Sequence, residues 1–108
     1  MTPSPLLISP ELLRSNAGQA VATLKLLANE DRLLLLCQLS QGECSVGELE
    51  LLLGIRQPTL SQQLGVLRTE QVVSTRRQGK NIFYSVADPA LLEILALLYL
   101  LYCSKEED

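Results

Sequence analysis

The feature that most constrains the fold is the very short connection, "IRQ", between two helical segments near the middle of the chain. Ser45 followed by Glu48 is a capping-box pattern, and Gly54 suits a left-handed C-cap, so a helix is predicted over residues 46–53. Pro58 suits the first turn of a second helix, predicted over about 57–70. Two short helices joined by a tight glycine-containing turn predict a helix-turn-helix.

The flanking segments predict three more helices and one small β-hairpin. Apolar residues at helical spacing predict helices over 11–28, 30–40 and about 89–103, the second of them capped by Asn29. After residue 70 the apolar period changes from 3.6 to 2, and "VVSTRR" and "KNIFYSVA" predict two strands with Gly79 at their turn. The expected fold is therefore mainly α with a small β-hairpin wing, a winged helix-turn-helix.

The expected organisation is one domain over residues 11–103, because 108 residues can build only one modest core. Residues 1–10 hold three of the five prolines and are expected to be a flexible arm, and residues 104–108 an acidic tail. No basic segment precedes the first apolar patch, and the longest apolar run is too short to span a membrane. We therefore expect a cytoplasmic protein with no membrane partner.

The last predicted helix, "ALLEILALLYLLYC", is apolar almost all the way round. Such a helix should be buried on two sides, against its own domain and against a partner, which predicts a homodimer. The residues expected at the dimer interface are Leu13, Leu92, Leu95, Leu98, Tyr99 and Tyr102.

The charge is distributed unevenly. The net charge is −3, yet the segment from Arg56 to Asn81 carries five cations against the single acid Glu70, a local +4 that leaves −7 elsewhere. A basic central segment between acidic ends is expected if one face meets phosphates and the rest does not.

The second helix of the motif has a small polar face suited to reading DNA. With Leu60, Leu64 and Leu67 turned inward, Gln, Ser and Thr side chains remain outward or at the core boundary, where they can bond base edges or phosphates. An ordinary solvated helix face is the alternative, but the neighbouring cations favour DNA, and no enzyme is needed to explain these residues. The residues expected to contact DNA are Arg56, Gln57, Thr59, Ser61, Gln62, Gln63, Arg68, Arg76, Arg77 and Lys80.

The order of elements and the string "GIRQPTLSQQLGVLRTEQVVSTRRQGKNIFYSV" resemble the ArsR/SmtB family of bacterial winged-helix repressors over nearly the whole chain. The recognition helix of that family typically reads Ser-Gln-Pro-Thr-Val-Ser-His-His-Leu, which aligns with Arg56 to Leu64. Two departures are Arg56, where the family often has Ser, and Gln71, where it often has Gly. The resemblance implies a symmetric dimer that binds a pseudo-palindromic operator in double-stranded DNA and leaves it when an inducer binds.

The metal-binding residues that the chain lacks limit the inducers it can sense. It has no histidine, no Cys-x-Cys and no Cys-x-x-Cys, so no metal site and no cofactor are expected, and a thiolate metal or metalloid sensor is the weaker alternative. Cys37 and Cys103 are placed as in the sulfide-responsive BigR/SqrR branch of the family. That resemblance implies that a disulfide or polysulfide bridge between them, formed in response to sulfide, persulfide or oxidant, releases the operator.

The thiols also allow other interpretations. Cys37 lies in a leucine run, where burial makes a thiol a small, slow hydrophobe, so a winged-helix module with no cysteine switch stays open. Cys103 is at a helix end, where more exposure is expected. Cys44 is expected to be a spectator in the loop before the helix over 46–53. A thiol enzyme is disfavoured, because no histidine can serve as its base.

Overall fold

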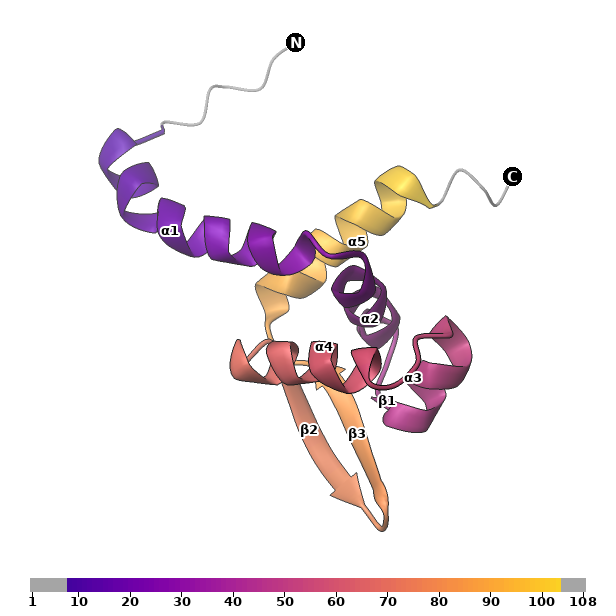
Figure 1. Cartoon of the computed structure of the whole chain (residues 1–108). Helices are drawn as coiled ribbons and strands as arrows, with labels where there is room; N and C mark the ends of the chain where they lie inside the picture. Colours follow the sequence, from indigo (N-terminus) through magenta and orange to yellow (C-terminus); the bar gives the residue numbers. More distant parts are fainter. Residues whose placement is uncertain (1–7, 104–108) are drawn as a thin grey trace.

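The structure is a computed structural model that describes residues 8–103, and these form a mainly helical winged helix-turn-helix (Figure 1). The elements in chain order are α1 (Pro10–Leu27), α2 (Glu30–Ser40), β1 (Cys44–Ser45), α3 (Val46–Leu53), α4 (Thr59–Thr69), β2 (Val73–Gln78), β3 (Asn81–Val86) and α5 (Pro89–Tyr102). The predicted fold class is confirmed. The predicted arm falls mostly, and the predicted acidic tail entirely, outside the described residues.

The helix starts are fixed by short polar side chains. Asn29 Oδ1 accepts from the Arg32 amide at 3.0 Å at the start of α2, as predicted. Ser45 and Glu48 form the predicted capping box, with the Glu48 carboxylate 2.8 Å from the Ser45 amide and the Ser45 hydroxyl 3.1 Å from the Glu48 amide. These caps satisfy amides that a helix start leaves without partners, so sequence alone located both helices.

Helix α4 begins at Thr59, two residues later than predicted. Proline disfavours the helical conformation in the residue before it, so Gln57 cannot be the first helical residue, and Pro58 takes the N-cap position. The side chain of Gln57 instead accepts from the Ser61 amide at 3.1 Å. Gln57 therefore supports the helix start from outside the helix.

Helix α4 ends with a residue that would ordinarily be glycine. Gln71 has φ +62°, its amide donates to the Arg68 carbonyl at 3.0 Å, and the Val72 amide donates to the Leu67 carbonyl at 3.2 Å. This is the Schellman arrangement, in which glycine is favoured at the left-handed position. The family departure noted at Gln71 therefore changes the residue and leaves the turn intact.

The hairpin is the predicted one, with a third strand added. Strands β2 and β3 pair antiparallel across Gly79, whose φ is +63°, and Tyr84 on β3 is buried. The two-residue strand β1 pairs with β3, with Cys44 opposite Tyr84. The prediction of a loop at Cys44 was wrong, because a strand of two residues carries no readable period and forms through its partner.

The core is built mainly from leucine around α2. Helix α2 packs against all four other helices and against β3, while α1 and α5 lie at one end of the molecule and the wing at the other (Figure 1). The fully buried side chains are Leu35, Leu36, Leu49, Leu60, Leu67, Leu91 and Leu95. The assignment of Leu95 to the dimer interface is thereby corrected, because this side chain is 1% exposed and already belongs to the protomer's own core.

Candidate nucleic-acid interface and thiol pair

Exposed cations lie at the two ends of α4 and on the wing, and α4 lies across the base of the wing (Figure 1). Arg56 precedes α4, Arg68 is in its last turn, and Arg77 and Lys80 lie towards the tip of the hairpin. All four are exposed, and within residues 8–103 none forms an ion pair. They are therefore available to bind phosphate oxygens on either side of a groove occupied by α4.

Arg76 differs from these cations because it is held within the protein. Its Nε and Nη2 donate to the two carboxylate oxygens of Glu43 at 2.7 and 2.8 Å, and its Nη1 donates to Gln78 Oε1 at 2.7 Å. The guanidinium also lies 4.6 Å from the centroid of the Phe83 ring. The hydrogen bond between the two groups raises the pKa of Arg76 and lowers the pKa of Glu43. Arg76 therefore braces the wing against the turn that follows α2.

The polar face of α4 divides into bonded and unbonded side chains. Gln57 Oε1 accepts from the Ser61 hydroxyl at 2.5 Å, and the half-buried Gln63 accepts from Arg32 at 3.1 Å. Thr59 is half-buried, whereas Gln62 is exposed and its side chain has no hydrogen-bond partner within the described part of the chain. Sequence had placed these residues on one reading face, and it missed the bonds to Arg32 and Glu43 because each joins residues more than thirty positions apart.

The three cysteines occupy different environments. Cys37 on α2 is half-buried, Cys103 caps the C-terminus of α5 and is exposed, and Cys44 is buried on β1, the edge strand of the sheet. Burial, followed by the negative charge of Cys103, raises the pKa of the Cys37 thiol, and helices α2 and α5 pack together. Burial likewise raises the pKa of Cys44, with the charge of Glu48 as the second cause. The charge of Cys103 therefore acts on the thiol of Cys37, whereas the charge that acts on Cys44 is that of Glu48.

The raised pKa of Cys37 yields a test of the interaction between the two thiols. Replacing Cys103 with Ser removes a negative charge near Cys37, so the pH profile of Cys37 alkylation should move to lower pH. It should stay above that of a free cysteine peptide, because burial is the larger cause. Site-resolved mass spectrometry after pulses of iodoacetamide at several pH values measures the shift. The matched control is Cys44→Ser, and a profile unmoved by Cys103→Ser would mean that the sulfurs do not interact.

Residues 8–103 contain neither a metal-binding cluster nor a membrane-spanning helix. In that range no three or more His, Cys, Asp or Glu side chains gather where they could hold a metal ion. None of the described helices is both long and apolar enough to cross a membrane.

A two-helix motif, an adjoining wing and unpaired cations around the second helix together define a winged-helix regulator that binds DNA. The family model described as bacterial regulatory protein, arsR family, matches residues 29–75, which run from the cap of α2 into β2. The chain belongs to this family, whose members are transcriptional regulators and not enzymes.

Relatives cover most of the chain. A biofilm growth-associated repressor of Agrobacterium fabrum is 50% identical over 96 residues, covering 89% of this chain and 82% of that protein. The crystal structure of the repressor BigR from Xylella fastidiosa is 44% identical, with a TM-score of 0.84, and covers 90% of this chain and 99% of that one. Reduced HlyU from Vibrio cholerae is 39% identical, with a TM-score of 0.83 and coverages of 87% and 99%. The resemblance to ArsR regulators is thereby confirmed.

Proposed function

We propose that this ArsR-family repressor binds a pseudo-palindromic operator as a homodimer and is released when Cys37 and Cys103 are joined through sulfur. The observation that carries the proposal is that Cys37 lies on α2 and Cys103 at the end of α5, two helices that pack together, and that the charge of Cys103 contributes to the raised pKa of Cys37. The inducer is a reactive sulfur species or another thiol oxidant. The similarity to a repressor over 89% of the chain supports the direction of regulation.

On the DNA, α4 would lie in the major groove with its N-terminal half against base edges. Gln62 can bond both edges of an adenine, and Ser61 can reach a base or a phosphate. Arg77 and Lys80 on the wing, with Arg56 and Arg68 at the ends of α4, would grip the backbone. Two-fold symmetry sets half-sites roughly 10 bp apart, or a multiple of that spacing.

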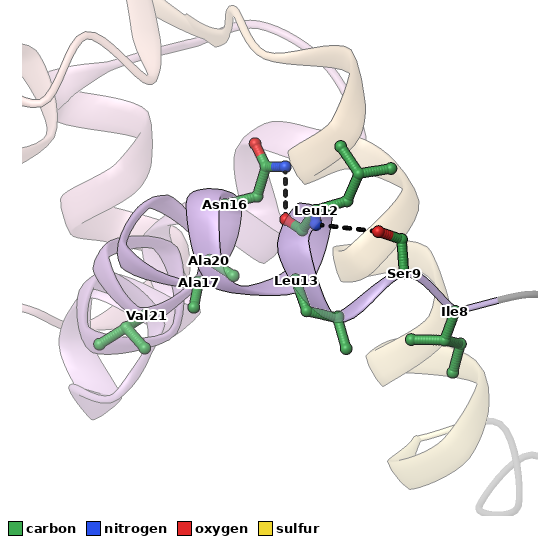
Figure 2. A pocket seen from close by; sticks show the side chains of 8 residues that line it. All are labelled: Ile8, Ser9, Leu12, Leu13, Asn16, Ala17, Ala20 and Val21. Atoms are coloured by element: carbon green, nitrogen blue, oxygen red, sulfur yellow. Dashed lines mark hydrogen bonds between the residues drawn. The ribbon is translucent and has the colours of Figure 1, made fainter.

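An exposed apolar surface on α1 and α5 supports the dimer. On α1 it forms a shallow groove of about 550 Å³, which Figure 2 shows lined by side chains of this helix and the two residues before it. We define the α1–α5 apolar face by its exposed members: Ile8, Leu12, Leu13, Val21, Leu24, Leu92, Leu97, Tyr99, Leu100, Leu101 and Tyr102. A surface this apolar is costly to leave in water, and a second copy of the chain supplies an identical face to cover it.

The covalent step needs an oxidant, which an inorganic polysulfide supplies. The Cys103 thiolate attacks an internal sulfur and displaces a shorter polysulfide anion, leaving a sulfur chain on Cys103. The Cys37 thiolate then attacks one sulfur of that chain, and the S–S bond beyond it breaks, so the outer sulfur or sulfurs leave as hydrosulfide or a polysulfide. Two electrons pass from the thiols to the inorganic sulfur, and the two thiol protons go to solvent. Cys103 attacks first because it is exposed, whereas Cys37 is half-buried with a raised pKa.

The length of the bridge gives a basis for selectivity. A direct disulfide needs Cα atoms within about 7 Å, and each added sulfur extends the reach by about 2 Å. A trisulfide or tetrasulfide can therefore join thiols that peroxide leaves apart. Mass spectrometry of the protein treated with polysulfide or with peroxide identifies the bridge that each oxidant forms. The same simple disulfide from both oxidants would contradict this basis for selectivity.

The DNA-binding half is tested by selecting duplexes from a random library with the reduced protein and measuring affinity against salt. Affinity should fall steeply with salt, and Arg77→Gln should weaken binding to all sequences and lower the salt slope by about one per protomer. Lys25→Gln, an exposed cation on α1, is the matched control and should keep the slope. Failure to retain any duplex would contradict the proposed function.

A further inference from the structure

A single guanidinium links three helices, α1, α2 and the recognition helix α4. Arg32 on α2 donates from Nε to the Leu26 carbonyl at 2.7 Å and from Nη2 to the Lys25 carbonyl at 3.1 Å. Its Nη1 donates to Gln63 Oε1 on α4 at 3.1 Å. Arg32 therefore contacts the end of α1 and the middle of α4 at once.

The end of α1 holds this guanidinium in place. The Lys25 and Leu26 carbonyls belong to the last turn of α1, where the helix dipole favours a cation, and the Lys25 carbonyl also accepts from the Ala28 amide at 3.2 Å. Two bonds to a helix end fix the plane of the guanidinium, so its third donor points in a set direction. Helices α1 and α4 each pack on α2, and between them lies a hollow of about 270 Å³ whose lining includes Ala22, Val66 and Glu70. Arg32 extends from α2 and forms part of the lining of that hollow.

The bond to Arg32 changes what Gln63 can do. Arginine has only donors, so the amide atom of Gln63 that faces it must be the oxygen. Bidentate reading of adenine needs the amide oxygen and the amide nitrogen of one glutamine together. The amide oxygen of Gln63 already accepts from Arg32, and this side chain is half-buried. The side chain of the neighbouring Gln62 is exposed and has no hydrogen-bond partner among residues 8–103. Adjacent residues point about 100° apart on a helix, so the two glutamines face different surroundings.

We propose that Arg32 and Gln63 form a strut that sets the orientation of α4, with Gln63 a positioning residue and Gln62 the base-reading one. The inference rests on the proposed binding of α4 to DNA and is independent of the thiol switch. Arg32 is hydrogen-bonded to the end of α1, and α1 carries part of the α1–α5 apolar face. The strut therefore links the recognition helix to the surface that is proposed to form the dimer. Loss of the strut should make α4 meet base edges poorly while the phosphate contacts persist.

The test makes the same substitution, glutamine to methionine, at the neighbouring positions Gln62 and Gln63. The probes are the duplex selected by the wild type, every single-base-pair variant of it, and poly(dI-dC) as a non-specific competitor. Gln63→Met should weaken binding to the selected duplex and its variants by a similar factor, on the order of tenfold, without changing the order of base preference or the affinity for poly(dI-dC). Gln62→Met should instead remove the preference at one base pair in each half-site.

Further variants separate positioning from general destabilisation. Gln63→Glu keeps an acceptor for Arg32, so it should keep the wild-type order of base preference. Arg32→Met should reproduce the effect of Gln63→Met, and the double variant should lose no more than either single one. Circular dichroism melts check folding, and Gln63→Met carries the test alone if Arg32→Met fails to fold.

Three results would overturn the strut. They are a preference lost at one base pair in Gln63→Met, an unchanged affinity in that variant, or additive losses in the double variant. A wild type that selects no duplex would instead defeat the proposed function.

Discussion

Polysulfide is expected to lower the affinity of the wild-type protein for its selected duplex by about 100-fold, while Cys37→Ser and Cys103→Ser keep their full affinity. A bridge between Cys37 and Cys103 ties α5 to α2, the helix that also packs on α4 and carries Arg32. A change in the position of α2 therefore affects both the helices of the α1–α5 apolar face and the recognition helix α4. Fluorescence anisotropy on reduced and treated proteins measures the loss, and intact-protein mass spectrometry counts the bridging sulfurs.

The third thiol provides the matched control for this experiment. Cys44 is buried, its pKa is raised by burial, and it lies on β1, the edge strand that pairs with β3 of the wing. Cys44→Ser should therefore release the duplex as the wild type does. If Cys37→Ser still releases the duplex after polysulfide treatment, the bridge is not the signal. If Cys44→Ser fails to release the duplex, the resolving thiol would be Cys44 instead.

The elements that sequence located are those defined by local chemistry. Asn29, the Ser45–Glu48 box and Gly54 act within a few residues of their own positions, so their spacing was enough to predict α2 and α3. The change of period after residue 70 located the hairpin for the same reason. Even the error at the start of α4 is local, because the restriction that Pro58 imposes on Gln57 can be read from the chain.

The features that sequence missed depend on residues far apart in the chain. Strand β1 exists because Cys44 and Ser45 meet β3 across the fold. The Arg32–Gln63 and Arg76–Glu43 bonds each bring together side chains from separate parts of the chain, and each engages a residue that was predicted to contact DNA. A list of cations and amides identified the candidate surface, but only packing could show which of them are already occupied.

Leu13→Glu is expected to convert the dimer to a monomer and to weaken operator binding by about 100-fold or more. Leu13 is 58% exposed and lines the apolar groove on α1 (Figure 2), so a carboxylate there would be buried without a partner in the dimer while costing the protomer little. A monomer holds one half-site at a time and forfeits the gain from binding two linked sites together, which is typically 10²–10⁴-fold.

Sedimentation equilibrium measures the dimer, and anisotropy on the selected duplex measures the binding. The matched control is Leu51→Glu on α3, where a leucine that is 85% exposed lies outside the α1–α5 apolar face, so this variant should remain dimeric. A Leu13→Glu protein that stays dimeric would exclude the α1 groove from the interface, and a Leu51→Glu protein that dissociates would move the interface to α3. Monomeric Leu13→Glu with wild-type affinity would instead show that one winged helix suffices, and the requirement for paired half-sites would fall.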